Sequence, residues 1–150
     1  MKNIRHIGIV VEDIERSLTF YRDLLGLKIE RDMLERSAYI DKILGLNNVS
    51  VRTVKLSAGD GTLIELLCYC NPSVREKSKT KINDIGCTHV AFTVNDIEKE
   101  YRRLIKKGVI FKSLPCKSPD GYAKVAFCRN PDGTFIELVE ILDKKSKAEK

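Results

Sequence analysis

Two segments of this chain occur twice, in the same order. Residues 6–15, HIGIVVEDIE, return as residues 89–98, HVAFTVNDIE, and residues 60–67, DGTLIELL, return as residues 132–139, DGTFIELV. A sequence that repeats in this way folds as repeated supersecondary units. The chain is therefore predicted to form two similar modules.

Both halves predict the same series of elements. Apolar residues alternate along residues 7–11 and again after residue 89, which is typical of a β-strand with two distinct faces. Asp13 and Asp96 follow these strands and are suited to cap helices with one apolar stripe, which Gly26 and Gly108 end. Short apolar runs between turn residues predict three further strands in each half: residues 27–31, 50–57 and 61–69, then residues 109–113, 123–128 and 133–141. The fold class is α+β, with two tandem βαβββ modules whose strands are mostly antiparallel.

The first half is longer than the second. His6 and Glu65 are 59 positions apart whereas His89 and Glu137 are 48 apart, so the first half carries 11 extra residues, which belong to residues 32–49. Within them, SAYIDKILGL offers a capping serine, apolar residues on one helix face and a stopping glycine. We predict a short helix over the sheet, a candidate lid.

Length and composition favour one compact unit. A chain of 150 residues with 43% apolar and 32% charged residues can bury one core without disulfides. Residues 1–142 are predicted to form a single domain, with one module at about residues 3–70 and the other at about 86–142. Residues 143–150 form a basic tail that we predict to be disordered.

Several classes of protein are excluded. No apolar run approaches the roughly 18 residues that cross a bilayer, and the N-terminal residues turn polar too soon for a signal peptide, so we expect a cytoplasmic protein with no membrane partner. Five cysteines without a C-x-x-C pair indicate reduced core thiols. The net charge of +6 is spread thinly, without aromatic residues between the basic ones, which predicts no nucleic-acid binding. An anionic small molecule fits this charge.

Two glutamates lie where carboxylates are rare. Glu65 in LIELL and Glu137 in FIELV are each central to an apolar predicted strand, and each shares its face with apolar side chains. A buried carboxylate is costly unless it is paired, bound to a metal or protonated.

The only two histidines, His6 and His89, begin the two equivalent strands. If the modules pack with pseudo-twofold symmetry, both imidazoles and both glutamates converge on one point. Such a set of two nitrogen and two oxygen donors suits Zn, Ni, Co, Mn or Fe(II). Taken singly, each histidine reads as a core residue and each glutamate as an exposed edge residue. Their repeat-equivalent positions favour the metal site.

The sequence resembles the vicinal oxygen chelate superfamily over roughly residues 3–142. The resemblance is carried by HIGIVVEDIERSLTFYRDLLGL, DGTLIELL, THVAFTVNDIE and NPDGTFIELVE. It implies a cupped sheet of paired βαβββ modules around one divalent ion, with Zn, Ni, Co or Mn ahead of Fe(II). It also implies that the four ligands are His6, Glu65, His89 and Glu137.

Within that superfamily, the His/Glu/His/Glu set resembles glyoxalase I (lactoylglutathione lyase), whereas the opening HIGIVVEDIE is more similar to methylmalonyl-CoA epimerase, which usually carries Gln in place of Glu65. Glyoxalases typically place a glutathione-binding arginine where this chain has Val10. The implied function is a metal-dependent lyase or isomerase that moves a proton next to a carbonyl. Glu137 is the expected base and Glu65 the group that returns the proton. The expected partners are a small anionic thioester or thiol conjugate and a second copy in a homodimer.

Two other functions stay open. Bleomycin-resistance-like members bind small molecules or drugs without metal catalysis, and extradiol dioxygenases hold Fe(II) with two histidines and one glutamate. Four charged or polar residues near the predicted strands read as surface residues and are left outside the site: Arg52, Lys55, Tyr122 and Lys124. The Cys68-x-Cys70 pair is expected to pack in the core.

Overall fold

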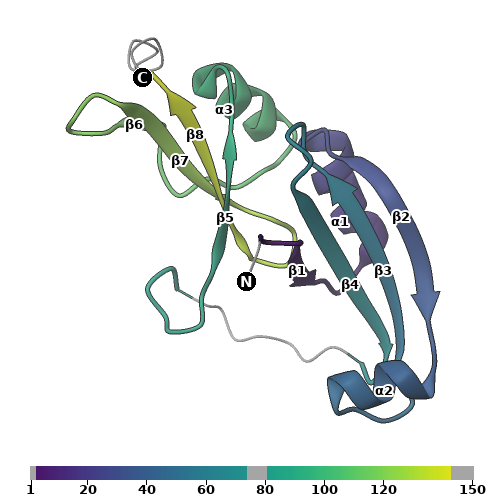
Figure 1. Ribbon diagram of the computed structural model, residues 1–150. Helices are drawn as coiled ribbons and strands as arrows, with labels where there is room; N and C mark the ends of the chain where they lie inside the picture. The colour runs from purple at the N-terminus through teal and green to yellow at the C-terminus, as the bar shows by residue number, and fades with distance from the viewer. Residues whose placement is uncertain (1–2, 74–80, 143–150) are drawn as a thin grey trace. The chain divides into compact units, whose positions relative to one another are not determined.

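A computed structural model describes residues 3–73 and 81–142 (Figure 1). The chain divides into two compact units, Met1–Lys77 and Ser78–Lys150. The predicted basic tail, residues 143–150, lies outside the described residues. In the described part of the chain, no helix is long and apolar enough to cross a membrane.

The first unit contains a mixed sheet in the order β1-β4-β3-β2. Strands β1 and β4 are parallel, and the other neighbours are antiparallel. Its described elements are β1 (Ile7–Val10), α1 (Ile14–Leu18), the π-helical turn η1 (Thr19–Leu24), β2 (Lys28–Glu35), α2 (Ala38–Leu44), β3 (Ser50–Ser57) and β4 (Leu63–Asn71).

The second unit repeats this plan in the order β5-β8-β7-β6, with β5 and β8 parallel. Its described elements are β5 (His89–Thr93), α3 (Ile97–Lys106), β6 (Cys116–Lys117), β7 (Ala123–Arg129) and β8 (Phe135–Ile141). Two tandem βαβββ modules are therefore confirmed.

The prediction of one strand is wrong. Residues 109–113 form no regular strand, and Phe111 makes only an isolated bridge with Cys128. The segment still bonds to β7, because the Lys112 amide donates to the Phe127 carbonyl over 2.8 Å. Pro115 then interrupts the ladder because it has no amide proton to donate, and the short strand β6 begins only after it.

The caps explain why both helices begin where the sequence predicts. The Asp13 carboxylate accepts hydrogen bonds from the amides of Glu15 and Arg16, and Asp96 accepts one from the Lys99 amide. Gly26 and Gly108 then adopt φ of +79° and +84°, a left-handed conformation that glycine reaches without strain. Local side-chain chemistry therefore sets both helix boundaries.

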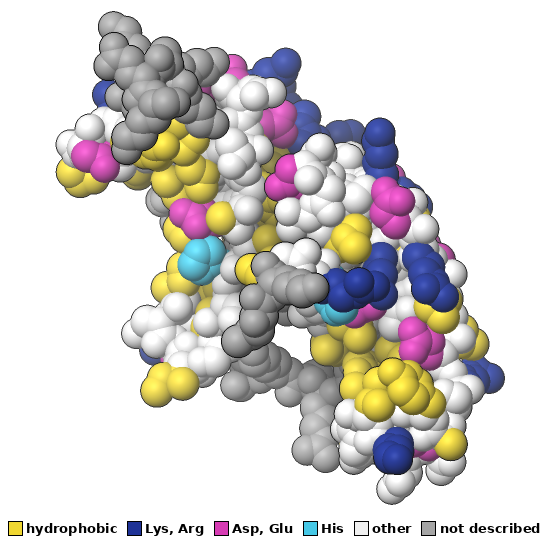
Figure 2. Space-filling view, viewed as in Figure 1, with side chains coloured by type: hydrophobic (Ala, Val, Ile, Leu, Met, Phe, Trp, Pro, Cys, Tyr) yellow, Lys and Arg dark blue, Asp and Glu magenta, His cyan; other side chains and the backbone are white. Residues whose placement is uncertain are grey.

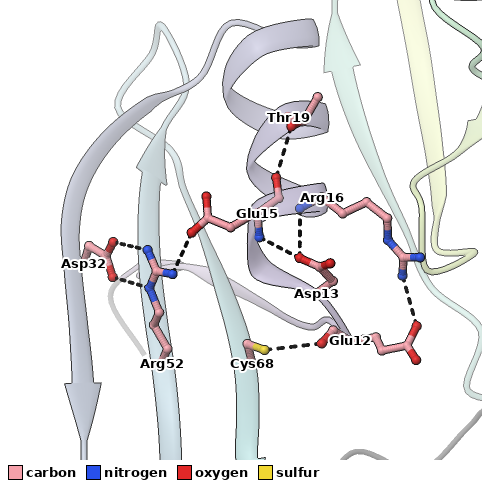
Figure 3. A network of polar contacts seen from close by, with 8 residues as sticks. All are labelled: Glu12, Asp13, Glu15, Arg16, Thr19, Asp32, Arg52 and Cys68. Atoms are coloured by element: carbon pink, nitrogen blue, oxygen red, sulfur yellow. Dashed lines mark hydrogen bonds and ion pairs between the residues drawn. The ribbon is translucent and has the colours of Figure 1, made fainter.

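An ion pair at equivalent positions joins helix to sheet in each unit. Arg52 on β3 contacts Glu15 on α1 over 2.7 Å, and Lys124 on β7 contacts Glu98 on α3 over 3.0 Å. Arg52 also donates two hydrogen bonds to the Asp32 carboxylate, and this interaction lowers the pKa of that carboxyl (Figure 3). These contacts hold Arg52 and Lys124 on the sheet face opposite the one that carries Glu65 and Glu137.

The core of each unit lies on the side of the sheet that these helices cover. In the first unit, Leu56, Ile64 and Leu66 alternate with residues of the other face and are almost fully buried. In the second unit, Ile136 and Leu138 occupy the equivalent positions on β8. Packing against the helix thus uses one face of each sheet, and the opposite face carries the two glutamates among apolar neighbours such as Leu67 and Phe135.

The cysteines only partly match the expectation of core thiols. All five are unpaired, but Cys70 and Cys116 are exposed, and Cys68 and Cys87 are half-buried. Only Cys128 is buried, and burial raises the pKa of its thiol to about 12. Cys70 and Cys116 lie near strand ends, and Cys87 lies in the loop before β5, where a small thiol reaches the surface.

The insertion forms the predicted short helix, α2. The Ser37 hydroxyl caps it by accepting from the Ile40 amide, and Gly45 ends it at φ +64°. Ile40 packs in a cluster with Val49 and Val51, with Leu67 against it. Since Leu67 shares its sheet face with Glu65, α2 covers one end of the face that carries the candidate site. A lid function stays a prediction.

Replacing Ser37 by Ala should lower the free energy of unfolding by about 1 kcal/mol, because one amide of the first turn of α2 loses its acceptor. Chemical denaturation of the metal-free protein measures this change. Ser113→Ala is the matched control, since that hydroxyl bonds only to the adjacent Leu114 carbonyl among the described contacts. Equal losses in the two variants would contradict the capping role.

Candidate metal centre

Glu65 lies near the start of β4, on the face away from α1. Its strand neighbours Ile64 and Leu66 point into the core, so alternation turns Glu65 to the opposite face. The register places Gly8 of β1 on one side of it and Lys55 of β3 on the other. A Cβ at Gly8 would lie 3.2 Å from Leu67 Cδ1, so any larger residue there would require the leucine side chain to shift.

The carboxylate of Glu65 has two close partners. His6 Nε2 lies 3.0 Å from Oε2, and Lys55 Nζ lies 3.2 Å from Oε1. Only 12% of the Glu65 side chain is exposed. Glu65 is therefore buried, and its contacts with His6 and Lys55 offset the cost of burying a carboxylate.

The second unit places Glu137 in the same way on β8. Ala91 of β5 and Phe127 of β7 are its neighbours across the sheet. His89 Nε2 lies 3.1 Å from Glu137 Oε2, and 18% of the glutamate side chain is exposed. The His89 ring also packs edge-on against Phe127, with 5.4 Å between ring centroids. This environment is more apolar than that of Glu65.

The structure thus joins the predicted residues in two pairs, His6 with Glu65 and His89 with Glu137. Among residues 3–73 and 81–142, no third His, Cys, Asp or Glu side chain completes a metal-binding group with either pair. Figure 2 shows exposed surface of both histidines (cyan), each beside an acidic side chain (magenta).

The donor atoms of each pair fit a shared divalent ion. Two donors bound at about 2.1 Å to one ion, at octahedral or tetrahedral angles, lie roughly 3.0 to 3.4 Å apart. The measured separations of 3.0 and 3.1 Å agree with this range. In addition, His6 Nδ1 is buried without a hydrogen-bond partner among the described residues, which costs about 1–3 kcal/mol.

Lys55 is the residue that the sequence interpretation left out. The sequence predicts a surface position for it, as for Arg52, but its ammonium group contacts Glu65. The sequence does contain a signal for this contact. Lys55 and Glu65 are equally far from Asp60 in the β3–β4 turn, so the hairpin register places them opposite each other. Tyr122, in contrast, is exposed and contacts neither glutamate among the described interactions.

Comparisons with known proteins identify the family of this chain. The sequence matches the profile of the Glyoxalase/Bleomycin resistance protein/Dioxygenase superfamily over residues 3–138. It is 32% identical over 154 residues to the lactoylglutathione lyase of Schizosaccharomyces pombe, covering 97% of this chain and 49% of that protein. The chain thus spans about half the length of this curated relative.

Two solved structures share the fold. A glyoxalase family protein from Bacillus cereus superposes with a TM-score of 0.87 at 25% identity, covering 95% of this chain and 96% of that one. The trypanothione-dependent glyoxalase I of Leishmania major superposes with a TM-score of 0.66 at 25% identity, covering 93% and 87% of the two chains. With the profile match over most of the sequence, these results show that the chain belongs to the Glyoxalase/Bleomycin resistance protein/Dioxygenase superfamily.

Proposed function

We propose that this protein is a metal-dependent lyase or isomerase that moves a proton on the carbon next to a carbonyl. His6, Glu65, His89 and Glu137 together would bind one divalent ion, with Zn, Ni, Co or Mn preferred to Fe(II). The observation that carries the proposal is the His–Glu pair that recurs at equivalent positions of both units, with 3.0 and 3.1 Å between donor atoms. Enzymes of this superfamily generally use a divalent metal.

The roles of the two glutamates follow from the proposed chemistry. A bound divalent ion would polarise the substrate carbonyl and stabilise the negative charge that develops on its oxygen. Glu137 would take the proton from the neighbouring carbon, and Glu65 would return it on the opposite side. Glu137 is preferred as the base because Lys55 already holds one oxygen of Glu65, whereas Phe127 lies beside Glu137.

A small anionic thiol conjugate or thioester fits this role. The name of the Schizosaccharomyces pombe relative, lactoylglutathione lyase, favours a reaction of the glyoxalase I type over one of the epimerase type. The net charge of +6 is compatible with an anionic substrate. A homodimer and a cytoplasmic location stay predictions.

Metal analysis followed by hydrogen exchange tests the proposal. The metal-free protein should bind one Zn²⁺ or Ni²⁺ per chain if both His–Glu pairs share an ion. In D₂O the loaded protein should then introduce deuterium next to the carbonyl of its substrate. The methylglyoxal–glutathione hemithioacetal and methylmalonyl-CoA are the compounds to try first, with mass spectrometry as the measurement.

Other outcomes would redirect the assignment. Two ions per chain would mean that each pair binds its own metal. Oxygen consumption with Fe(II) and a catechol, without deuterium exchange, would support a dioxygenase. Failure to bind any of these metals would leave a metal-free binding protein as the better description.

A further inference from the structure

The two candidate half-sites are equivalent in backbone but not in charge. The registers of the two hairpins place Lys55 opposite Glu65 and Phe127 opposite Glu137, so a lysine and a phenylalanine occupy the same position of the repeat. In Figure 2 one histidine surface adjoins Lys and Arg side chains (dark blue), and the other adjoins apolar side chains (yellow). The proposed function assigns no role to this difference between a lysine and a phenylalanine.

Lys55 gives Glu65 a complete set of partners without a metal. One carboxylate oxygen contacts the Lys55 ammonium and the other contacts the His6 imidazole. Among the described residues, the Glu137 carboxylate has a polar contact only with His89. The Lys55 side chain is itself only 25% exposed, so this ion pair is less weakened by solvent than a surface pair.

We propose that Lys55 is a built-in counter-ion of Glu65, which stabilises the first half-site without metal and lowers its affinity for a divalent cation. This inference rests on the proposed function, which takes Glu65 as a ligand of one divalent ion shared with Glu137. A cation bound to Glu65 lies within a few ångströms of the Lys55 ammonium, and like charges at such distances repel strongly in partly buried surroundings. Lys55 is therefore a positioning residue rather than a catalytic one.

The same lysine changes the charge of the loaded site. With neutral imidazoles, the two glutamates cancel the charge of a divalent ion, and Lys55 adds one positive charge. The site then keeps an attraction for an anionic substrate. Phe127 contributes no such charge, so this attraction belongs to the half-site of the first unit.

Lys55→Met tests this role, with Lys124→Met as the matched control. Lys124 is also a strand lysine paired with a glutamate, at 3.0 Å and with 26% of its side chain exposed, but it lies outside the candidate site. The two measurements are the thermal stability of the metal-free protein and the dissociation constant for Zn²⁺, obtained by competition with a chromophoric chelator.

Metal-free Lys55→Met should unfold at a lower temperature than Lys124→Met, because it leaves a more deeply buried carboxylate without its cation. Its affinity for Zn²⁺ should nevertheless rise about tenfold, which corresponds to about 1.4 kcal/mol. Lys124→Met should bind Zn²⁺ as the unchanged protein does. Lys55→Arg should restore the original affinity because it keeps the charge. Damage to the fold alone would not tighten metal binding.

Unchanged or weaker Zn²⁺ binding by Lys55→Met would overturn the proposal. If that variant does not fold, Lys55→Gln, which keeps a hydrogen-bond donor without the charge, provides the same comparison. If the unchanged protein binds no metal, the proposed function fails instead. The counter-ion role is then decided by metal-free stability, and equal melting temperatures for Lys55→Met and Lys124→Met would refute it.

Discussion

Replacing Glu137 by Gln should lower kcat by about 10²- to 10⁴-fold while the protein keeps its fold and much of its metal. Gln retains an oxygen that can bind the ion but cannot accept a proton, and general base catalysis typically contributes a factor of this size. Glu137 is held on β8 between Ala91 and Phe127, so a side chain of the same shape fits the site. Turnover of the hemithioacetal or thioester and metal content, measured on the same samples, check the result.

Glu65→Gln is the comparison variant for this experiment. It should weaken metal binding modestly and reduce turnover less than Glu137→Gln does, because Lys55 already restrains Glu65. If each glutamate serves one stereochemical course, the two variants will each lose activity on a different enantiomer of the substrate. Full activity in Glu137→Gln would refute its assignment as the base.

Replacing His89 by Ala should lower the metal affinity by at least about 10- to 100-fold. Loss of a residue that hydrogen-bonds to a metal ligand typically lowers metal affinity by this factor, and loss of the ligand itself should lower it at least as much. The His89 side chain is about half exposed, so its removal should change stability little, and the loss of metal can be attributed to the missing donor. Titration of the metal-free variant with Zn²⁺ is the measurement.

His6→Ala provides the control that separates a shared ion from two independent ones. With one shared ion, both variants should lose the same single metal. With one ion for each pair, each variant should keep the ion of the other pair at full affinity. If both variants bind Zn²⁺ as the unchanged protein does, the assignment of these histidines as metal ligands is wrong.

Local rules made the sheet faces of Glu65 and Glu137 predictable from the amino-acid sequence. The alternation of a strand sends Glu65 and Glu137 to one face and their apolar neighbours to the other, and this alternation depends only on residue order. Asp13 and Asp96 cap their helices through hydrogen bonds within three residues. The internal repeat then added information that a single copy lacks, because it shows that the two glutamates are equivalent to each other, as are the two histidines.

Features that depend on residues distant in sequence required the tertiary structure. Lys55 resembled Arg52 as a strand cation, but the pairing of β3 with β4 sends Lys55 to Glu65, whereas Arg52, on the other face, reaches Glu15 of α1. The apolar run around Cys70 predicts a core residue, yet Cys70 is exposed near the end of β4. Hydrophobic pattern and residue type are properties of a short segment, but the partner of a charge and the burial of a side chain depend on which strand or helix packs beside that segment.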